Sequence, residues 1–285
     1  MATGEDDHAH HQGLAHDLRV LSRRRMLGMV ARGAAGLSLI PVLSSCSGDD
    51  GATVDAGTGV DASAGADGST VDSGAVSCST IPTETAGPYP GDGTNGANAL
   101  TLSGIVRSDI TTSIGGVSGT AAGVPLTVTL TLLDSTTCAP LVGYAIYLWH
   151  CDRDGNYSMY TGAAASQNYL RGVQITDSAG QVTFTTIFPA CYSGRWPHIH
   201  FEMYASAAAA TNGSAKVAVS QLALPKAACD TVYAQTGYST SVSNLANVTL
   251  ASDNVFSDGS TLQVPTVTGS VAAGYAAALT VAIRA

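Results

Sequence analysis

Residues 143–160 read GYAIYLWHCDRDGNYSMY, and residues 170–204 read LRGVQITDSAGQVTFTTIFPACYSGRWPHIHFEMY. Short apolar runs rich in Ile, Val, Tyr and Phe alternate here with turns that contain Asp and Gly, which predicts β-strands. His198 and His200 lie two positions apart in one such run. Side chains at that spacing leave the same face of a strand, so both imidazoles would point to one place.

The pattern of short strands continues through the chain after residue 79. It is clearest in PLTVTLTLLD (125–134), where apolar residues alternate with Thr. Further strands are expected at 143–150, 182–187, 199–203, 217–222 and 277–283. Because no segment after residue 79 shows a convincing helical period, we predict an all-β fold, a two-sheet β-sandwich spanning 79–285.

Two tyrosines extend the histidine pair to a candidate metal site. Tyr157 follows the turn DRDGN, and Tyr192 lies in PACYSGR. Imidazole suits several transition metals, whereas a phenol binds only after losing a proton whose usual pKa is about 10. That loss requires a strongly Lewis-acidic cation, and Fe(III) is the natural candidate. The predicted ligands of a non-haem Fe(III) ion are Tyr157, Tyr192, His198 and His200.

Other interpretations of the histidine pair stay open. Glu202 follows His200 by two positions and shares its face, so H-x-H-x-E would give a 2-His-1-carboxylate Fe(II) site. A zinc or copper oxidase would use the H-x-H pair without the tyrosines. Of these interpretations, the two tyrosines favour the ferric site.

These motifs resemble the intradiol ring-cleavage dioxygenases, which include catechol 1,2-dioxygenases and protocatechuate 3,4-dioxygenase. The family patterns are W-H-x-D-x-x-G-x-Y-S, L-R-G-x-Q-x-T-D-x-x-G and T-I-x-P-x-x-Y-x-x-R-x-x-H-I-H. They are matched here by WHCDRDGNYS (149–158), LRGVQITDSAG (170–180) and TIFPACYSGRWPHIH (186–200). The resemblance covers most of 79–285. It implies a prealbumin-like sandwich with the iron site at one end.

The resemblance also implies a reaction. A catechol-type substrate would bind the ferric ion and displace Tyr157, and O2 would open the ring to a cis,cis-muconate-type product. Arg195 and Gln221 match the family's catalytic arginine and glutamine. The segment Thr85-Ala86-Gly87-Pro88-Tyr89 resembles a pocket-lining T-x-G-P-Y, although a Pro- and Gly-rich loop would also cover a sheet edge. Trp196 departs from the pattern and would narrow the pocket or stack on an aromatic ring.

Residues 1–46 have the features of an export signal. Residues 22–27 (SRRRML) resemble a twin-arginine motif, and an apolar run leads to LSSC, which resembles a lipobox with Cys46 lipidated. Residues 47–78 hold six Asp and no Lys or Arg in a low-complexity sequence, which predicts a flexible linker. We therefore expect an exported lipoprotein, membrane-anchored in the periplasm or at the cell surface.

Charge and cysteine content narrow the class of protein. The 285-residue chain has a formal charge of −9, which excludes the basic surface of a nucleic-acid-binding protein. An oxidising compartment permits disulfides among its six cysteines. Cys138 and Cys151 flank one predicted strand, so we expect that pair. Cys191 with Cys229 is a second candidate pair, which leaves Cys78 without a disulfide partner.

A non-catalytic function stays open on the sequence alone. β-Sandwiches often bind carbohydrate or protein, so a surface lipoprotein with a vestigial site would be a binding module. A metal-free, transthyretin-like structural domain is a further alternative. Four ligand residues in the expected order favour the enzyme, since a degenerate module should have lost at least one. The choice of catechol and the assembly, as a monomer or a homo-oligomer, stay open at this point.

Overall fold

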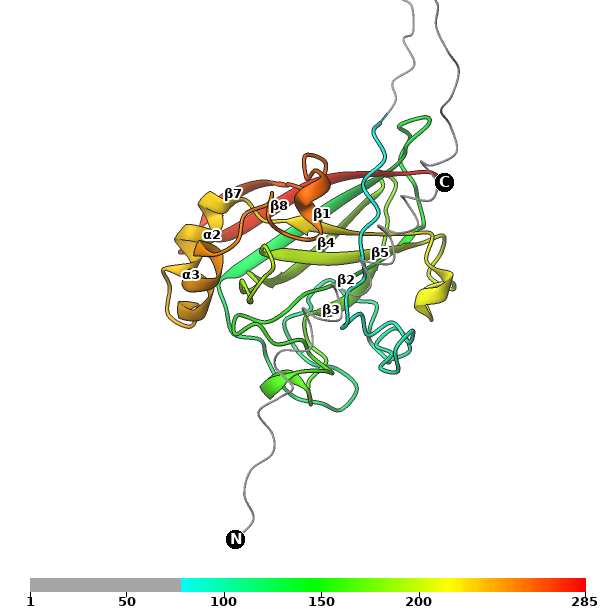
Figure 1. Cartoon of the computed structure of the whole chain (residues 1–285). Coiled ribbons are helices and arrows are strands. Elements are labelled where there is room, and N and C mark those ends of the chain that lie inside the picture. The colour runs from blue at the N-terminus through cyan, green and yellow to red at the C-terminus, as the bar shows by residue number, and fades with distance from the viewer. Residues whose placement is uncertain (1–77) are drawn as a thin grey trace, which may run out of the picture. The chain divides into compact units, whose positions relative to one another are not determined.

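The computed structural model describes residues 78–285, so the export signal, Cys46 and nearly all of the linker lie outside the described residues. Residues 78–285 form two four-stranded β-sheets that enclose one large hydrophobic core (Figure 1). This confirms the predicted two-sheet sandwich. None of the helices in this part of the chain has the length and hydropathy needed to cross a bilayer.

The first sheet has the strand order β4-β1-β8-β7. Its members are β1 (Pro125–Asp134), β4 (Gln181–Ile187), β7 (Thr266–Ser270) and β8 (Gly274–Ile283). β1 pairs antiparallel with β4 and parallel with β8. Val128, Leu130 and Leu132 are fully buried, and the threonines between them are partly exposed. The alternation of apolar residues and threonines along this strand therefore matches the alternation of buried and partly exposed side chains.

The second sheet has the strand order β3-β2-β5-β6, and all of its pairs are antiparallel. Its members are β2 (Ala145–Trp149), β3 (Arg171–Ile175), β5 (His198–Tyr204) and β6 (Ala218–Ala223). Every residue of β2 and β5 is buried. One face packs into the core between the sheets, and a second apolar cluster that includes residues 99–105 covers the other face.

The register of the second sheet brings four polar or aromatic side chains into one row. Gln221 is paired with His200, His200 with Trp149, and Trp149 with Arg171. Paired residues project to the same face of a sheet, so this row crosses all four strands. It lies on the face turned away from the core between the sheets, under the covering loops.

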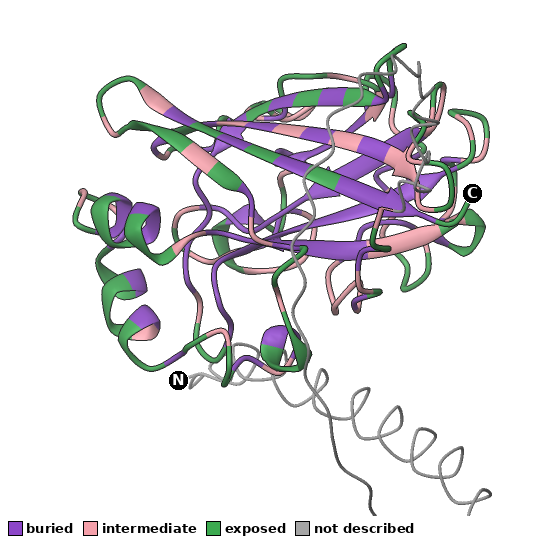
Figure 2. Ribbon diagram, turned by 90° about the horizontal axis from the view of Figure 1, so that it is seen from above, coloured by how far each residue is buried: buried purple, intermediate pink, exposed green. Residues whose placement is uncertain are grey.

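Two short helices contradict the expectation of no helix after residue 79. They are α2 (Lys226–Tyr233) and α3 (Ser239–Ala246), at one end of the sandwich beside β7 (Figure 1). Helices of eight residues depend on tertiary packing, so their sequence period is weak. The 3-10 turns are η2 (Gly162–Ala164), η3 (Gly213–Ala215) and η4 (Phe256–Asp258). Figure 2 shows that each α-helix keeps a buried side and an exposed side.

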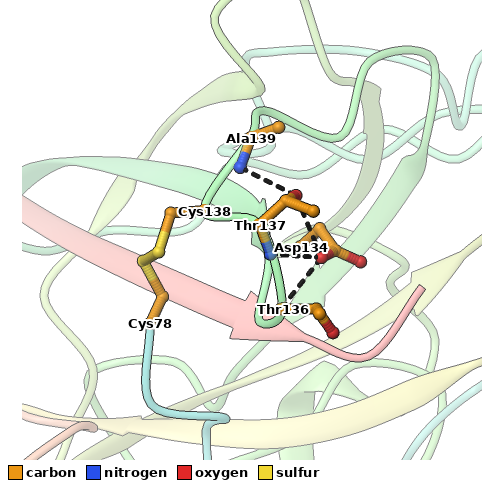
Figure 3. Close-up of a disulfide and its surroundings, with 6 residues drawn as sticks. All are labelled: Cys78, Asp134, Thr136, Thr137, Cys138 and Ala139. Atoms are coloured by element: carbon orange, nitrogen blue, oxygen red, sulfur yellow. Dashed lines mark hydrogen bonds between the residues drawn. A yellow bond between two sulfur atoms is a disulfide. The ribbon is translucent and has the colours of Figure 1, made fainter. Parts of the chain in front are cut away.

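The disulfide joins Cys78 to Cys138, with Cα atoms 5.5 Å apart (Figure 3). The expected pair Cys138–Cys151 is therefore wrong, because the two residues flank opposite ends of β2 and an extended strand separates them. The second candidate, Cys191 with Cys229, is also wrong. Among residues 78–285, the free, buried cysteines are Cys151, Cys191 and Cys229.

The N-terminal segment, defined as residues 78–90, leads from the disulfide to the second sheet. The Ile81 amide donates to the Ala282 carbonyl at 2.9 Å, and the Glu84 amide donates to the Val219 carbonyl at 3.1 Å. The Ser220 hydroxyl donates to the Pro82 carbonyl. These bonds direct the T-x-G-P-Y sequence toward the row that contains His200.

The disulfide should contribute measurably to stability. It closes a loop with a sequence separation of 60, so Cys138→Ser should lower the free energy of unfolding by about 3 kcal/mol through greater freedom of the unfolded chain. Urea unfolding would measure this. Reductant should shift the wild-type midpoint to that of the variant and leave the variant unchanged. A wild-type midpoint that does not respond to reductant would contradict the assignment.

Candidate metal centre

Four donor atoms from three segments converge on the covered face of the second sheet. Tyr157 Oη lies 3.3 Å from His198 Nε2 and 3.4 Å from His200 Nε2. Tyr192 Oη lies 3.2 Å from His198 Nε2, and the two Nε2 atoms are 3.1 Å apart. The structure thus brings all four predicted ligands together. We call them the donor cluster.

The spacing of the donor cluster fits one metal ion. Nitrogen and oxygen ligands bind such a cation at about 2.1 Å, which places neighbouring ligand atoms roughly 3.0 to 3.4 Å apart. The separations in the cluster lie in this range. Among residues 78–285, no group of three His, Cys, Asp or Glu side chains is placed to hold a metal ion. A metal site here therefore depends on the two tyrosines.

The two imidazoles have the protonation state that metal binding requires. His198 Nδ1 is 2.6 Å from the Trp196 carbonyl oxygen, which only accepts, so Nδ1 carries the proton and the lone pair of Nε2 faces the cluster. Burial lowers the pKa of both histidines well below the usual value, with further lowering by the charge of Arg195. Neutral imidazole is the form that ligates metals.

His200 is oriented by stacking. Its ring lies 4.8 Å from that of Trp149 with an interplanar angle of 6°. Its Nδ1 is buried without a hydrogen-bond partner, while Nε2 points at the donor cluster. In the tautomer with the proton on Nδ1, this imidazole would offer a metal ion the Nε2 lone pair.

The tyrosines supply oxygen donors that only a strong Lewis acid would ionise. Burial is the largest cause that raises the pKa of Tyr157 well above its usual value, followed by the nearby Tyr192. The loop carrying Tyr157 is fixed by Asp152, whose Oδ1 accepts from the Asn156 amide at 2.8 Å. A β-carbon on Gly155, at φ 89°, would lie 3.4 Å from Tyr192 Cβ, so this turn packs against the second tyrosine.

Glu202 does not join the donor cluster. It shares the face of His200, but its Oε1 accepts from Lys216 Nζ at 2.8 Å and its Oε2 from Tyr204 Oη at 2.6 Å. Burial raises the pKa of this carboxyl to about 7, against the lowering effect of Lys216. The carboxylate is therefore bonded to Lys216 and Tyr204 instead of facing the donor cluster. The H-x-H-x-E alternative thus loses its third ligand.

The N-terminal segment lies against the donor cluster. A β-carbon on Gly87, at φ 71°, would lie 3.4 Å from His200 Cε1. The ring of Tyr89 is 5.1 Å from that of Tyr157. The Gly87 amide donates to Thr85 Oγ1, and the Pro88 carbonyl accepts from Asn95. This backbone therefore forms one wall beside the donor cluster.

Arg195 and Gln221 are bonded to each other. Arg195 Nη2 donates to Gln221 Oε1 at 2.7 Å, and Gln221 Nε2 donates to the Thr85 carbonyl at 2.8 Å. The charge of Arg195 also acts on the cluster, since it opposes the raised pKa of Tyr157. Trp196 behaves differently: its indole lies in the core between the sheets and donates to the Leu224 carbonyl. The predicted place for Trp196 in the pocket has no support in this packing.

Arg171 is a site residue that sequence analysis missed. This buried guanidinium donates from Nε to the Ser158 hydroxyl, from Nη1 to the Pro90 carbonyl and Tyr147 Oη, and from Nη2 to the Tyr89 and Ser158 carbonyls. It thus joins the residue after Tyr157 to the N-terminal segment. All five acceptors are remote from Arg171 in sequence. The position of Arg171 in the LRG motif was therefore the one available sign of its role.

Known proteins share this arrangement of sequence and fold. A family model described as Dioxygenase matches residues 106–217, which include all four donors. A chlorocatechol 1,2-dioxygenase of Rhodococcus opacus is 37% identical over 57 residues, which is 20% of this chain and 22% of that protein. The match therefore spans about a fifth of the curated relative.

Solved structures extend the likeness over most of the chain. An intradiol ring-cleavage dioxygenase from Tetranychus urticae has a TM-score of 0.58 at 25% identity, covering 72% of this chain and 95% of that chain. The dioxygenase Tetur07g02040 has a TM-score of 0.56 at 27% identity, with coverage of 72% and 94%. The donor cluster lies inside the matched region, so the chain is similar in both sequence and fold to intradiol ring-cleavage dioxygenases.

Proposed function

We propose that this protein is a non-haem Fe(III)-dependent intradiol dioxygenase. It opens the ring of a catechol-type aromatic with O2 and forms a cis,cis-muconate-type product. The observation that supports this most directly is the convergence of two phenol oxygens and two imidazole nitrogens at 3.1 to 3.4 Å. The names of the relatives support the reaction class.

The donor set suits ferric iron better than a divalent ion. Two phenolates would neutralise much of a 3+ charge in a buried site, whereas a 2-His-1-carboxylate site offers one anionic protein ligand. Both histidines are neutral and need no proton removed. The ligands of the ion are then Tyr157, Tyr192, His198 and His200. A bound ferric ion would supply Lewis acidity toward the substrate oxygens and the covalency that lets O2 attack the ring.

The chain's own residues would bind, orient and exchange protons. Tyr157 Oη is suited to hold a proton that the substrate gives up, because burial raises the pKa of this phenol when no metal ionises it. The absence of a side chain on Gly87 leaves room beside His200. The Arg195 guanidinium would stabilise negative charge that develops on the ring. The Tyr89 ring covers Tyr157 and helps to exclude water.

We also propose that the protein is exported and anchored to a membrane through Cys46. The disulfide between Cys78 and Cys138 supports export, because disulfides persist in oxidising compartments. Acyl chains at Cys46 would hold the enzyme at the periplasmic or outer surface.

Lipidation can be tested by metabolic labelling. Growth with an alkyne fatty acid should label the wild-type protein, and Cys46→Ser should abolish the label because the acyl acceptor is lost. Cys229→Ser, at a buried free thiol, controls for thiol reactivity in the folded domain. A Cys46→Ser protein that is still labelled would exclude this anchor.

The ferric site predicts a visible charge-transfer band. The iron-loaded protein should be coloured, and anaerobic 4-methylcatechol should shift the band to longer wavelength. Tyr192→Phe should lose most of the band because one phenolate ligand is gone. Tyr144→Phe, in a tyrosine that packs against the core between the sheets, should keep it. A colourless wild-type protein with one bound iron would exclude tyrosinate ligation.

The reaction itself is tested by isotope incorporation. Under 18O2 the iron-loaded wild type should convert 4-methylcatechol to a ring-opened dicarboxylate that contains both labelled atoms, as mass spectrometry would show. His200→Ala should reduce turnover by at least about a thousandfold, which is the size of effect expected when an essential catalytic group is removed. A wild-type product without labelled oxygen would contradict a dioxygenase.

Glu202→Gln separates the ferric site from the carboxylate alternative. Because Glu202 binds Lys216 and Tyr204, this change should leave iron content and the visible band unchanged. Loss of the charged hydrogen bond should lower the free energy of unfolding by about 2 kcal/mol. Iron analysis, the spectrum and urea unfolding would measure these effects. Loss of iron from a folded Glu202→Gln protein would favour the H-x-H-x-E site.

A further inference from the structure

Asp253 places a fully buried carboxylate beside Arg195. Its Oδ2 accepts from Arg195 Nε at 3.0 Å and from the Trp196 amide at 2.6 Å. Its Oδ1 accepts from the Val255 amide at 2.8 Å and the Phe256 amide at 3.1 Å. Asp253 and Arg195 are 0% and 2% exposed. One carboxylate thus joins the turn after Asp253 to the segment between the ligands Tyr192 and His198.

These bonds fix the plane of the Arg195 guanidinium. Nε is held by Asp253 and Nη2 by Gln221, so neither rotation about the Cδ–Nε bond nor a swing of the side chain keeps both contacts. Nη1 donates to neither partner. Gln221 is in turn anchored to the Thr85 carbonyl of the N-terminal segment. A continuous hydrogen-bonded line therefore runs from Asp253 past the donor cluster to the wall beside it.

The pairing also solves an electrostatic problem. A guanidinium buried this deeply is costly unless a partner compensates its charge, and loss of one partner leaves the other charge unpaired. Asp253 supplies this compensation from a segment that lies 58 positions further along the chain. It contacts none of the four donor atoms. Its influence on the chemistry must therefore pass through Arg195 or Trp196.

We propose that Asp253 is a positioning residue of the active site, which sets the orientation of the Arg195 guanidinium toward the substrate. The assignment rests on the proposed function of the donor cluster. It also places an essential part of the site beyond residue 217, where the family model ends. A purely structural role, as the cap of the turn that leads into η4, makes a different prediction when Arg195 is changed as well.

Asp253→Asn is the variant that separates these roles. Asn keeps an oxygen that accepts from the Val255 and Phe256 amides, but its NH2 group cannot accept from Arg195 Nε or the Trp196 amide. The full-chain protein, loaded with iron, should show kcat for 4-methylcatechol lowered about tenfold to a hundredfold by displacement of the guanidinium. KM, iron content and the resting visible band should change little, because no ligand is touched.

A double-mutant cycle identifies the route of the effect. Arg195→Lys cannot make both contacts of the guanidinium, so Asp253→Asn added to Arg195→Lys should slow turnover little further. Asp258→Asn, at an exposed carboxylate of the neighbouring 3-10 turn, is the matched control and should keep wild-type kcat. Thermal unfolding of each variant, and titration with anaerobic 4-methylcatechol, would accompany the rates.

The outcomes separate the two proposals. Rate losses that add in the double variant would overturn positioning through Arg195, and so would an Asp253→Asn protein with wild-type kcat per bound iron. If the loss of kcat is fully explained by a smaller fraction of folded protein, Asp253 has a structural role and the proposal is overturned. A wild type that binds iron and catechol but never opens the ring would instead overturn the proposed function.

Discussion

The alternation of side chains along β5 is the constraint on which the site depends. His198, His200, Glu202 and Tyr204 point to the covered face of the second sheet, while Ile199, Phe201 and Met203 enter the core between the sheets. A slip of one residue would bury imidazoles in that core and turn Ile199, Phe201 and Met203 toward the loops. The packing of three apolar side chains therefore also fixes the direction of the His198 and His200 side chains.

The covered face combines deep burial with an unusual amount of polar chemistry. Two neutral imidazoles and a phenol with a raised pKa meet there. Two buried guanidinium groups also lie at this face, and they are stabilised differently. Arg171 is surrounded by five uncharged oxygens, whereas Arg195 has the Asp253 carboxylate. Such a face is stable only if loops shield it and satisfy its polar groups.

The sequence predicted the parts of the molecule that local patterns encode. Short-range signals predicted the H-x-H pair, the turns around Tyr157 and Tyr192, and the strand 125–134. The structure has each of these features at the expected place. The two-sheet fold followed from the alternation of apolar and polar residues in such strands. The failures are long-range. The pairing of Cys78 with Cys138, the core position of Trp196, and the contacts of Arg171 and Asp253 depend on segments tens of residues apart.

The strands β3 and β7 and the helices α2 and α3 were missed for a related reason. β3 contains Arg171 and Gln174 within a row of apolar residues, and β7 is a short, mostly exposed edge strand, so neither shows clear alternation. The helices are fixed by the core they cover. The Glu202 alternative could not be decided from spacing, because Lys216 and Tyr204 compete for its carboxylate only in the folded chain.

The parallel pairing of β1 with β8 has a consequence for the order of folding. Leu126 is paired with Tyr275 and Asp134 with Ile283, so the centre of the first sheet joins the beginning of the domain to its last strand. Pairings this distant in sequence make folding slow, because a large loop must close before the contacts form. The first sheet cannot be completed until β8 has left the ribosome. The Ile81 amide, which donates to the Ala282 carbonyl, cannot dock before then, so the wall beside the donor cluster is among the last parts of the domain to assemble.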